Sequence, residues 1–356
     1  MEPTNSQPQQ RFRILSLDGG GIRGAFTASV LATLEEDTRL AAADHFDLIT
    51  GTSTGGIIAL GLGLGFPASR IRDFYRDQGP VIFPSTGFFR GAWRTARHLV
   101  RPKRSHDELA QALASVFEKR QLGESRTRLV IPTYDAVAGR VFLLKTAHHK
   151  RFDADYSALA VDCALATASA PTYFRAAQFP KHPGASYIDG GVWANCPALV
   201  GLIEATAFLD KSPKQIDILS IGTTTQPFSV SQGRRLGGIL HWNKGILNLL
   251  MKGQEQAALA QVGLLAGSFY RIDSVVCGGR YSLDNARKEL IEELIALGFG
   301  EAKKKERQEV VRARFLNGVK IEPFAPAHRL SLEQSGRLPH DGTSDASFVL
   351  PSSFST

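Results

Sequence analysis

Ser53 has the surroundings of a hydrolytic nucleophile. It is the third residue of GTSTGG, residues 51–56, which matches the pattern G-x-S-x-G. The motif lies between the apolar run 46–49, expected to be a strand, and an apolar stretch from Ile57, expected to be a helix; this setting is the one in which the pattern carries a nucleophile. The small neighbours Gly51 and Gly55 permit a sharp turn that exposes the hydroxyl, and the N-terminus of the following helix favours negative charge.

A glycine loop, DGGGIRG at residues 18–24, follows another short apolar run. Gly19, Gly21 and Gly24 fit G-x-G-x-x-G, a pattern found in dinucleotide-binding folds. Such a fold needs an acidic residue about 20 positions later, at the end of the second strand. The acidic residues 35–37 fall instead at the end of an expected helix, and the second strand leads into the turn at the candidate nucleophile. The spacing therefore argues against a dinucleotide site.

Three consecutive glycines suit an oxyanion hole. The N–H groups of Gly19, Gly20 and Gly21 can point inward together and stabilise the negative charge that develops during acyl transfer. The alternative from another class of protein is a nucleotide- or phosphate-binding regulatory module that uses the GGGIRG loop. Such a module has no need of a nucleophile and a base, so these two residues discriminate between the alternatives.

Asp189 is the candidate general base. It follows Tyr187 and Ile188, expected to end a strand, and precedes Gly190 and Gly191. Because Asp-Gly pairs are ordinary turn formers, the motif is weak by itself. A hydrolase triad in the order nucleophile, acid, histidine would need a later histidine, and the candidates are His241, His328 and His340. None has the setting of a catalytic histidine, so a Ser–Asp dyad requires fewer assumptions.

The expected elements form an α/β fold. Two strand–glycine turn–helix units occupy the first 65 residues, a pattern typical of a sheet with helices on its faces. Further strands are expected at 129–134, 141–145 and 216–221, and helices at 158–169 and 284–297. We find no internal repeat.

Composition limits the functional classes. The chain has 356 residues, of which 43% are hydrophobic and 21% charged, so it is globular rather than disordered or fibrous. Its net charge of +8 favours an anionic partner, which can be a nucleic acid, a membrane surface or a charged small molecule, and the charge does not choose among them. Three scattered cysteines form neither a disulfide framework nor a CxxC metal site and indicate a reducing, cytoplasmic compartment. No signal peptide or transmembrane span is evident, so membrane contact is expected to be peripheral.

The loop DGGGIRG, the turn GTSTGG and the triplet DGG, in this order, resemble the patatin-like phospholipase family from about Arg13 to Thr224. The resemblance implies a three-layer α/β/α sandwich with a mainly parallel central sheet, and hydrolysis of lipid acyl esters by a Ser–Asp dyad without a metal. It implies that Ser53 is the nucleophile, that Asp189 is the base and that the three-glycine loop is the oxyanion hole. The motif residues expected to support them are Arg23, Gly24, Gly51, Gly55, Gly190 and Gly191.

Within that family, LSLDGGGIRG, GTSTGG, APTYF and DGGVWANCP most resemble bacterial members, which include anti-phage phospholipase effectors activated by a cyclic nucleotide. This resemblance implies a cyclic dinucleotide as activator, no required cofactor, and membrane phospholipids as substrate. It also implies a cytoplasmic protein that associates with the inner leaflet. No nucleic-acid partner is expected, and the oligomeric state is left open.

The domain is expected to span 11–329, between a disordered arm at 1–10 and a flexible tail at 330–356. The segment 88–104 interleaves aromatic and basic residues and acidic residues are absent from it, which fits either an anionic bilayer or a solvated cap. A groove for single-stranded nucleic acid is a third alternative, but no fold signature for one is recognised. The amphipathic stretch 233–252 is either a lid or lipid-facing segment or a packed helix.

Overall fold

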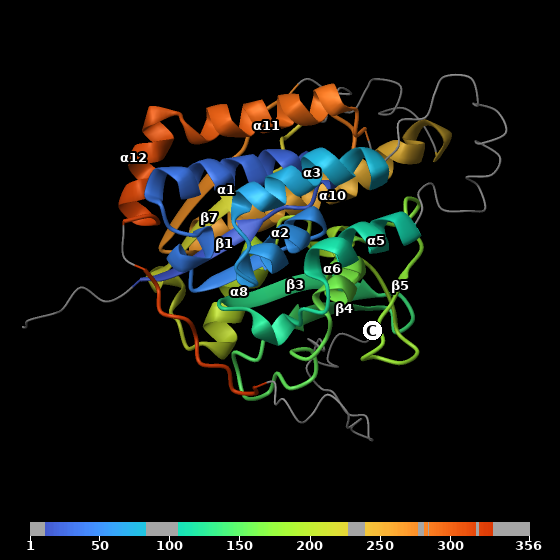
Figure 1. The fold of residues 1–356 in the computed structure, drawn as a ribbon, viewed down its shortest axis with the longest axis horizontal. Helices are drawn as coiled ribbons and strands as arrows, with labels where there is room; N and C mark the ends of the chain where they lie inside the picture. The colour runs from blue at the N-terminus through green and yellow to red at the C-terminus, as the bar shows by residue number, and fades with distance from the viewer. Residues whose placement is uncertain are drawn as a thin grey trace, which may run out of the picture.

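The computed structural model describes residues 11–82, 106–226, 239–276, 281–283, 285–317 and 320–329, with side chains at 239–248 left out (Figure 1). The expected arm, the expected tail and the basic aromatic segment 88–104 lie outside these residues, as does the first part of 233–252. In the described part of the chain, no helix has the length and apolar character needed to span a bilayer.

Eight strands form one mixed sheet in the order β5-β6-β3-β2-β1-β7-β8, with β4 paired to β3. The five strands from β3 to β8 along this order are parallel, whereas β4, β5 and β6 pair antiparallel. The expected mainly parallel sheet is thus confirmed at its centre. The strands are β1 (Phe12–Leu17), β2 (Leu48–Gly51), β3 (Arg128–Asp135), β4 (Arg140–Lys145), β5 (Ala177–Gln178), β6 (Ser186–Asp189), β7 (Ile216–Ile221) and β8 (Ser268–Ile272).

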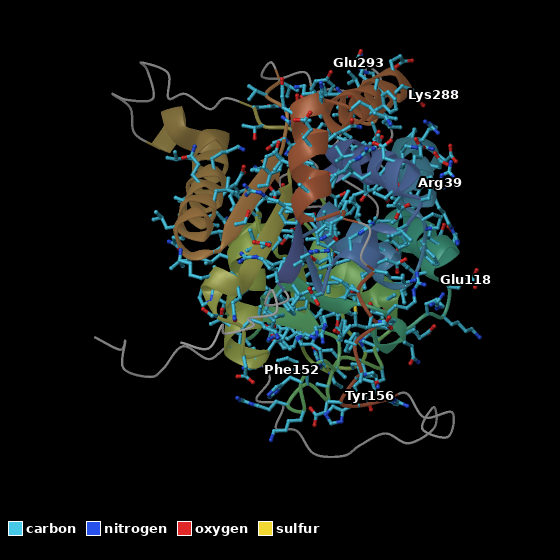
Figure 2. All side chains as sticks on the ribbon, turned by 90° about the vertical axis from the view of Figure 1, so that its left-hand side faces the viewer. Arg39, Glu118, Phe152, Tyr156, Lys288 and Glu293 are labelled. Atoms are coloured by element: carbon cyan, nitrogen blue, oxygen red, sulfur yellow. The ribbon has the colours of Figure 1, made fainter. Side chains whose placement is uncertain are left out.

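Helices cover both faces of the sheet, as Figure 2 shows with α8 and α10 on one side and α1 and α5 on the other. The expected α/β/α sandwich is therefore confirmed. Its described helices are α1 (Gly24–Thr38), α2 (Thr54–Gly63), α3 (Ala68–Ile82), α5 (His106–Phe117), α6 (Ala160–Ala168), α7 (Gly191–Ala194), α8 (Ala198–Phe208), α10 (Ile239–Leu265), α11 (Lys288–Ala302) and α12 (Lys305–Arg314).

The central strands bury side chains on both faces. In β1, Ile14 packs in the core under α8 and α10, whereas Leu15 and Leu17 pack under the helices of the opposite face. In β7, Ile218 likewise packs under α8 and α10, and Leu219 packs under the helices of the opposite face. Because successive side chains of a strand point to opposite faces, a strand covered on both sides needs apolar residues on both of them.

Strands β2 and β6 meet end to end along one edge of β3. β4 occupies the other edge, while β2 pairs with residues 128–130 and β6 with residues 133–135 of β3. Since β2 runs parallel to β3 and β6 runs antiparallel, their carboxyl ends face each other. Pro132 lies in the junction, where its missing N–H leaves no unpaired donor. This arrangement brings the residues that follow β2 close to the last residue of β6.

Candidate active site

Ser53 occupies a sharp turn between β2 and α2. Its φ of 55° and ψ of −122° belong to a region that non-glycine residues rarely adopt, at a cost of about 1–3 kcal/mol. Two close backbone approaches permit the turn: a Cβ on Gly51 would lie 2.2 Å from the Gly55 carbonyl oxygen, and one on Gly55 would lie 2.2 Å from that of Leu17. The expected requirement for small neighbours is therefore explained by backbone packing.

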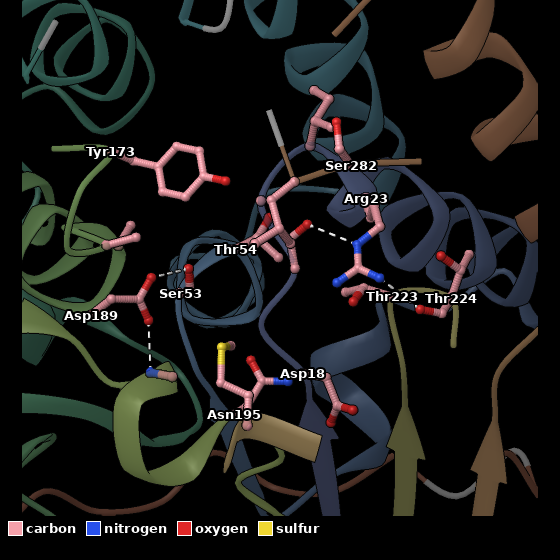
Figure 3. Close-up of a pocket in the computed structure, with 18 of the residues that line it drawn as sticks. Asp18, Arg23, Ser53, Thr54, Tyr173, Asp189, Asn195, Thr223, Thr224 and Ser282 are labelled. Carbon is pink, nitrogen blue, oxygen red and sulfur yellow. Dashed lines mark hydrogen bonds between the residues drawn. The ribbon is translucent and has the colours of Figure 1, made fainter. Parts of the chain in front are cut away.

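Ser53 and Asp189 are hydrogen-bonded and buried. Ser53 Oγ donates to Asp189 Oδ2 at 2.6 Å, and the Gly191 N–H donates to Asp189 Oδ1 at 2.7 Å (Figure 3). The Ser53 N–H donates to Thr167 Oγ1 at 3.0 Å, and this hydroxyl donates to the Pro132 carbonyl at 2.6 Å. The junction of β2 and β6 thus brings together two residues that the sequence predicted separately.

Burial raises the pKa of Asp189 to about 6, and the hydrogen bonds from Ser53 and Gly191 act against this rise. A carboxyl group with this pKa is mostly ionised at neutral pH yet retains affinity for a proton. It therefore has the properties that a general base needs.

The glycine loop lies between β1 and α1, and its carbonyl groups are held by side chains. Thr223 Oγ1 donates to the Gly19 carbonyl at 2.9 Å, and Arg23 Nε donates to the Gly20 carbonyl at 3.3 Å. The Gly19 N–H donates to the Asn195 carbonyl at 3.0 Å. Within the described residues, no acceptor is recorded for the N–H groups of Gly20 and of Gly21, so these two donors are available.

Arg23 and Gly24 fix the loop to the rest of the site. Arg23 Nη1 also donates to the Thr224 carbonyl at 2.9 Å, and burial lowers the pKa of this guanidinium. A Cβ on Gly24 would lie 2.1 Å from Thr54 Oγ1, so the start of α1 packs directly on the residue after Ser53. Similarly, a Cβ on Gly190 would lie 2.3 Å from the Pro132 carbonyl oxygen.

A cavity of about 410 Å³ is lined by Ser53, Asp189 and the glycine loop. One part of its lining is apolar and comes largely from α2, α3 and α5, and another part is charged. No histidine occurs among the described lining residues. The apolar part includes Ile22, Ile57, Phe74, Ile82, Leu109 and Phe174; the charged part includes Asp18, Arg23, Lys252, Glu255, Arg271 and Asp273.

The sequence did not predict the ionic network beneath the glycine loop. Arg271 Nη2 lies 2.7 Å from Asp18 Oδ2, 2.9 Å from Asp273 Oδ2 and 3.5 Å from Glu255 Oε1. Burial raises the pKa of Asp18 to about 6 even though Arg271 opposes the rise. Asn195 was also missed as a cavity residue, although it lies within the quoted motif DGGVWANCP.

Of the three candidate histidines, only His328 has a side chain that the structure describes, and it lies outside the cavity. His328 Nε2 donates to the Lys150 carbonyl at 2.8 Å and is absent from the cavity lining. The side chain of His241 and the whole of His340 lie outside what the structure describes. Among the described residues, no group of three or more His, Cys, Asp or Glu side chains is arranged to hold a metal ion.

A family model for patatin-like phospholipases matches residues 15–202. The chain is 37% identical over 272 residues to a cGAMP-activated phospholipase of Pseudomonas aeruginosa, covering 74% of this chain and 78% of that protein. It is 34% identical over 329 residues to a cGAMP-activated phospholipase of Vibrio cholerae, with 83% and 92% covered. Human GIVD cytosolic phospholipase A2 is similar in structure at a TM-score of 0.45 and 11% identity, with 87% and 59% covered.

Proposed function

Because the chain belongs to the patatin-like phospholipase family, we propose that it is a phospholipase A type enzyme with Ser53 as nucleophile and Asp189 as general base. The observation that supports this assignment most directly is the 2.6 Å hydrogen bond from Ser53 Oγ to Asp189 Oδ2, formed in a buried site beside a large cavity.

In this mechanism Asp189 takes the Ser53 hydroxyl proton while Oγ attacks the ester carbonyl carbon. The resulting tetrahedral intermediate collapses, the bond to the alcohol oxygen breaks, and Asp189 returns the proton to that leaving oxygen. A water molecule then attacks the acyl-enzyme. Asp189 accepts the proton of this water and passes it to Ser53 Oγ as the fatty acid leaves.

Gly20 and Gly21 are the proposed oxyanion donors. In a trans peptide the C=O and the following N–H point in opposite directions. The hydrogen bond from Thr223 to the Gly19 carbonyl therefore fixes the Gly20 N–H, and the bond from Arg23 to the Gly20 carbonyl fixes the Gly21 N–H. The Gly19 N–H is not available as a third donor, because it is already donated to the Asn195 carbonyl.

The cavity has an apolar part and a charged part, as a phospholipid has acyl chains and a polar headgroup. The apolar part, between α2, α3 and α5, suits an acyl chain, and the charged part suits a polar headgroup. The regulatory-module alternative does not account for a strained serine that is hydrogen-bonded to a buried aspartate beside the glycine loop.

Activation by a cyclic dinucleotide is the proposed regulation. The P. aeruginosa and V. cholerae relatives are cGAMP-activated, and the net charge of +8 suits an anionic activator and an anionic membrane. The proposed place of action is the cytoplasmic side of the membrane, at the inner leaflet.

The test is Ser53→Ala in the full chain, with Ser29→Ala as the matched control, since Ser29 is a buried serine on α1 that bonds the Ile295 carbonyl. Both variants are incubated with mixed phospholipid vesicles, with and without cGAMP, and fatty-acid release and labelling by a fluorophosphonate are measured. We expect Ser53→Ala to fold, to lose labelling and to lose at least about 10⁴-fold in turnover. Full activity in this variant would refute the nucleophile, and release that is equal without cGAMP would refute the activation.

A further inference from the structure

We infer that Phe74 sets the length of the acyl chain that the cavity accepts, an inference that rests on the proposed ester hydrolysis. Phe74 lies on α3, is 9% exposed and lines the 410 Å³ cavity together with Ile57 of α2. The same two side chains also line a second hollow of about 10 Å³. Ile57 and Phe74 therefore form a partition between the cavity that holds Ser53 and an apolar space behind it.

The hollow continues the cavity by one helical turn. Residues three or four positions apart share a face of a helix and are displaced by about one turn, roughly 5.4 Å. On each of the three helices around the partition, a residue that lines the cavity lies one turn from a residue that lines the hollow. The pairs are Ile57 and Gly61 on α2, Phe74 and Ile71 on α3, and Leu109 and Leu113 on α5.

The far end of the hollow is lined by two aromatic rings. Phe66 and Phe117 stack there with ring centroids 6.0 Å apart, and the Arg70 guanidinium lies 4.2 Å from the Phe66 centroid. Helices α2 and α3 approach closely beside the hollow, since a Cβ on Gly61 would lie 2.8 Å from Ile71 Cδ1. Removing the partition would lengthen the cavity by about the one helical turn that separates the two sets of lining residues.

The Phe74 ring is held at a fixed distance from the nucleophile. It packs edge-on against Tyr75, with ring centroids 5.5 Å apart and an interplanar angle of 77°. The Tyr75 hydroxyl donates to the Thr54 carbonyl at 3.2 Å and is hydrogen-bonded to the Thr54 hydroxyl. Since Thr54 follows Ser53 directly, this part of α3 is tied to the catalytic turn, and the ring can act as a stop for a chain esterified at Ser53.

A chain that reaches Phe74 gains nothing from further carbons, whereas each methylene that enters the opened hollow should raise kcat/KM about fourfold. We expect Phe74→Ala to move the preferred acyl length upward by about two to four carbons, the number that one helical turn accommodates. Phe74→Leu removes less of the ring and should move it by a smaller step.

The experiment measures kcat/KM of the purified full chain, with cGAMP present, on p-nitrophenyl esters from butyrate to stearate. Phe74→Ala and Phe74→Leu are compared with wild type and with Leu109→Ala, which widens the first cavity without opening the partition. We expect a longer optimum in the Phe74 variants alone. If wild type hydrolyses no ester, the proposed function fails. If wild type is active and the folded Phe74 variants keep the wild-type optimum, the role of Phe74 is refuted. It is also refuted if Leu109→Ala shifts the optimum by the same amount. If Phe74→Ala does not fold, the optimum of Phe74→Leu provides the test.

Discussion

Asp189 and Glu204 are both buried carboxylates, at 6% and 1% exposure, but their surroundings differ. Asp189 accepts hydrogen bonds from the neutral donors Ser53 and Gly191. Glu204, on α8, accepts from Lys145 Nζ at 2.8 Å and contacts His148 Nε2 at 3.0 Å. Burial raises the pKa of Asp189 to about 6, whereas these partners lower the pKa of Glu204 despite its burial.

The difference shows that burial alone does not decide what a carboxylate does. With no cation among its described partners, Asp189 keeps its affinity for a proton, which the proposed catalysis requires and stability does not. Glu204 instead joins β4 to α8, and Lys145 Nζ also lies 4.3 Å and 4.5 Å from the ring centroids of Phe152 and Phe208. We therefore expect the first carboxylate to matter for turnover and the second for folding.

The largest expected effect is that of Asp189→Asn on turnover. Loss of the base should lower kcat about 10²- to 10⁴-fold, while the free energy of unfolding stays the same or rises because an unpaired buried charge is removed. Fatty-acid release and urea unfolding measure the two quantities, with the exposed Asp153→Asn as control. An Asp189→Asn enzyme that retained a tenth of wild-type turnover would contradict the assignment.

Glu204→Gln should produce the opposite pattern. Removing one partner of a buried ion pair leaves the Lys145 charge uncompensated and typically costs about 3–5 kcal/mol of unfolding free energy. The kcat of the protein that remains folded should match wild type. Urea unfolding and active-site titration with a fluorophosphonate separate these effects, and the exposed Glu309→Gln provides the control. An unchanged free energy of unfolding in Glu204→Gln would contradict the expected role of Glu204 in folding.

The pH dependence of stability should have opposite signs for the two groups. The folded pKa of Asp189, about 6, exceeds its ordinary 3.8, so the native state binds more protons between these values. Stability should therefore fall by about 3 kcal/mol as pH rises through this window. The folded pKa of Glu204 is lowered, so the stability that this carboxylate contributes is fully present above pH 4.5. It is lost as pH falls through the folded pKa.

Urea unfolding of wild type, Asp189→Asn and Glu204→Gln across the acid range tests these signs. The stability advantage of Asp189→Asn over wild type should grow from about pH 4 to pH 6 and then level off. Asp18, whose pKa is also raised to about 6, titrates in both proteins and cancels from this difference. An advantage that shrank with rising pH would contradict the direction given for Asp189.

The smallest effect comes from placing a cation near Asp189. Val192 lies on α7, three residues after Asp189, lines the same cavity and is 38% exposed. The ammonium of Val192→Lys should favour the ionised carboxylate and lower the pH of half-maximal kcat/KM by about half a unit. Val192→Met controls for side-chain length. A midpoint that stayed in place or moved upward would show that Asp189 does not set this pH profile.

The sequence predicted the parts of the fold in which local pattern and burial agree. The strand expected at 216–221 has the observed bounds of β7, because both faces of β7 are buried and its apolar residues lie on both of them. The strand expected at 46–49 lies at Leu48–Gly51 instead. Phe46 precedes the strand and packs against Phe315, with ring centroids 6.3 Å apart.

The motifs correctly placed Ser53 after a strand, Asp189 at a strand end and the glycine loop before a helix. Their partners could not be found in this way. Thr167, Asn195 and Arg271 reach the site through the order of the strands and the helices between them, and a short sequence pattern does not encode that order. The antiparallel direction of β6, which turns Asp189 toward Ser53, also depends on pairing with β3.

The order of the strands also bears on how the protein is made. A ribosome releases Ser53 long before Asp189, 136 residues later, and the supports of the glycine loop come later still. The Asp18 and Ile22 N–H groups bond the carbonyls of Ile221 and Leu283, each at 3.1 Å. Contacts between such distant residues form late in folding. Under the proposed mechanism, Ser53 therefore lacks its base and its oxyanion donors until the chain is complete, and the enzyme gains activity only after synthesis ends.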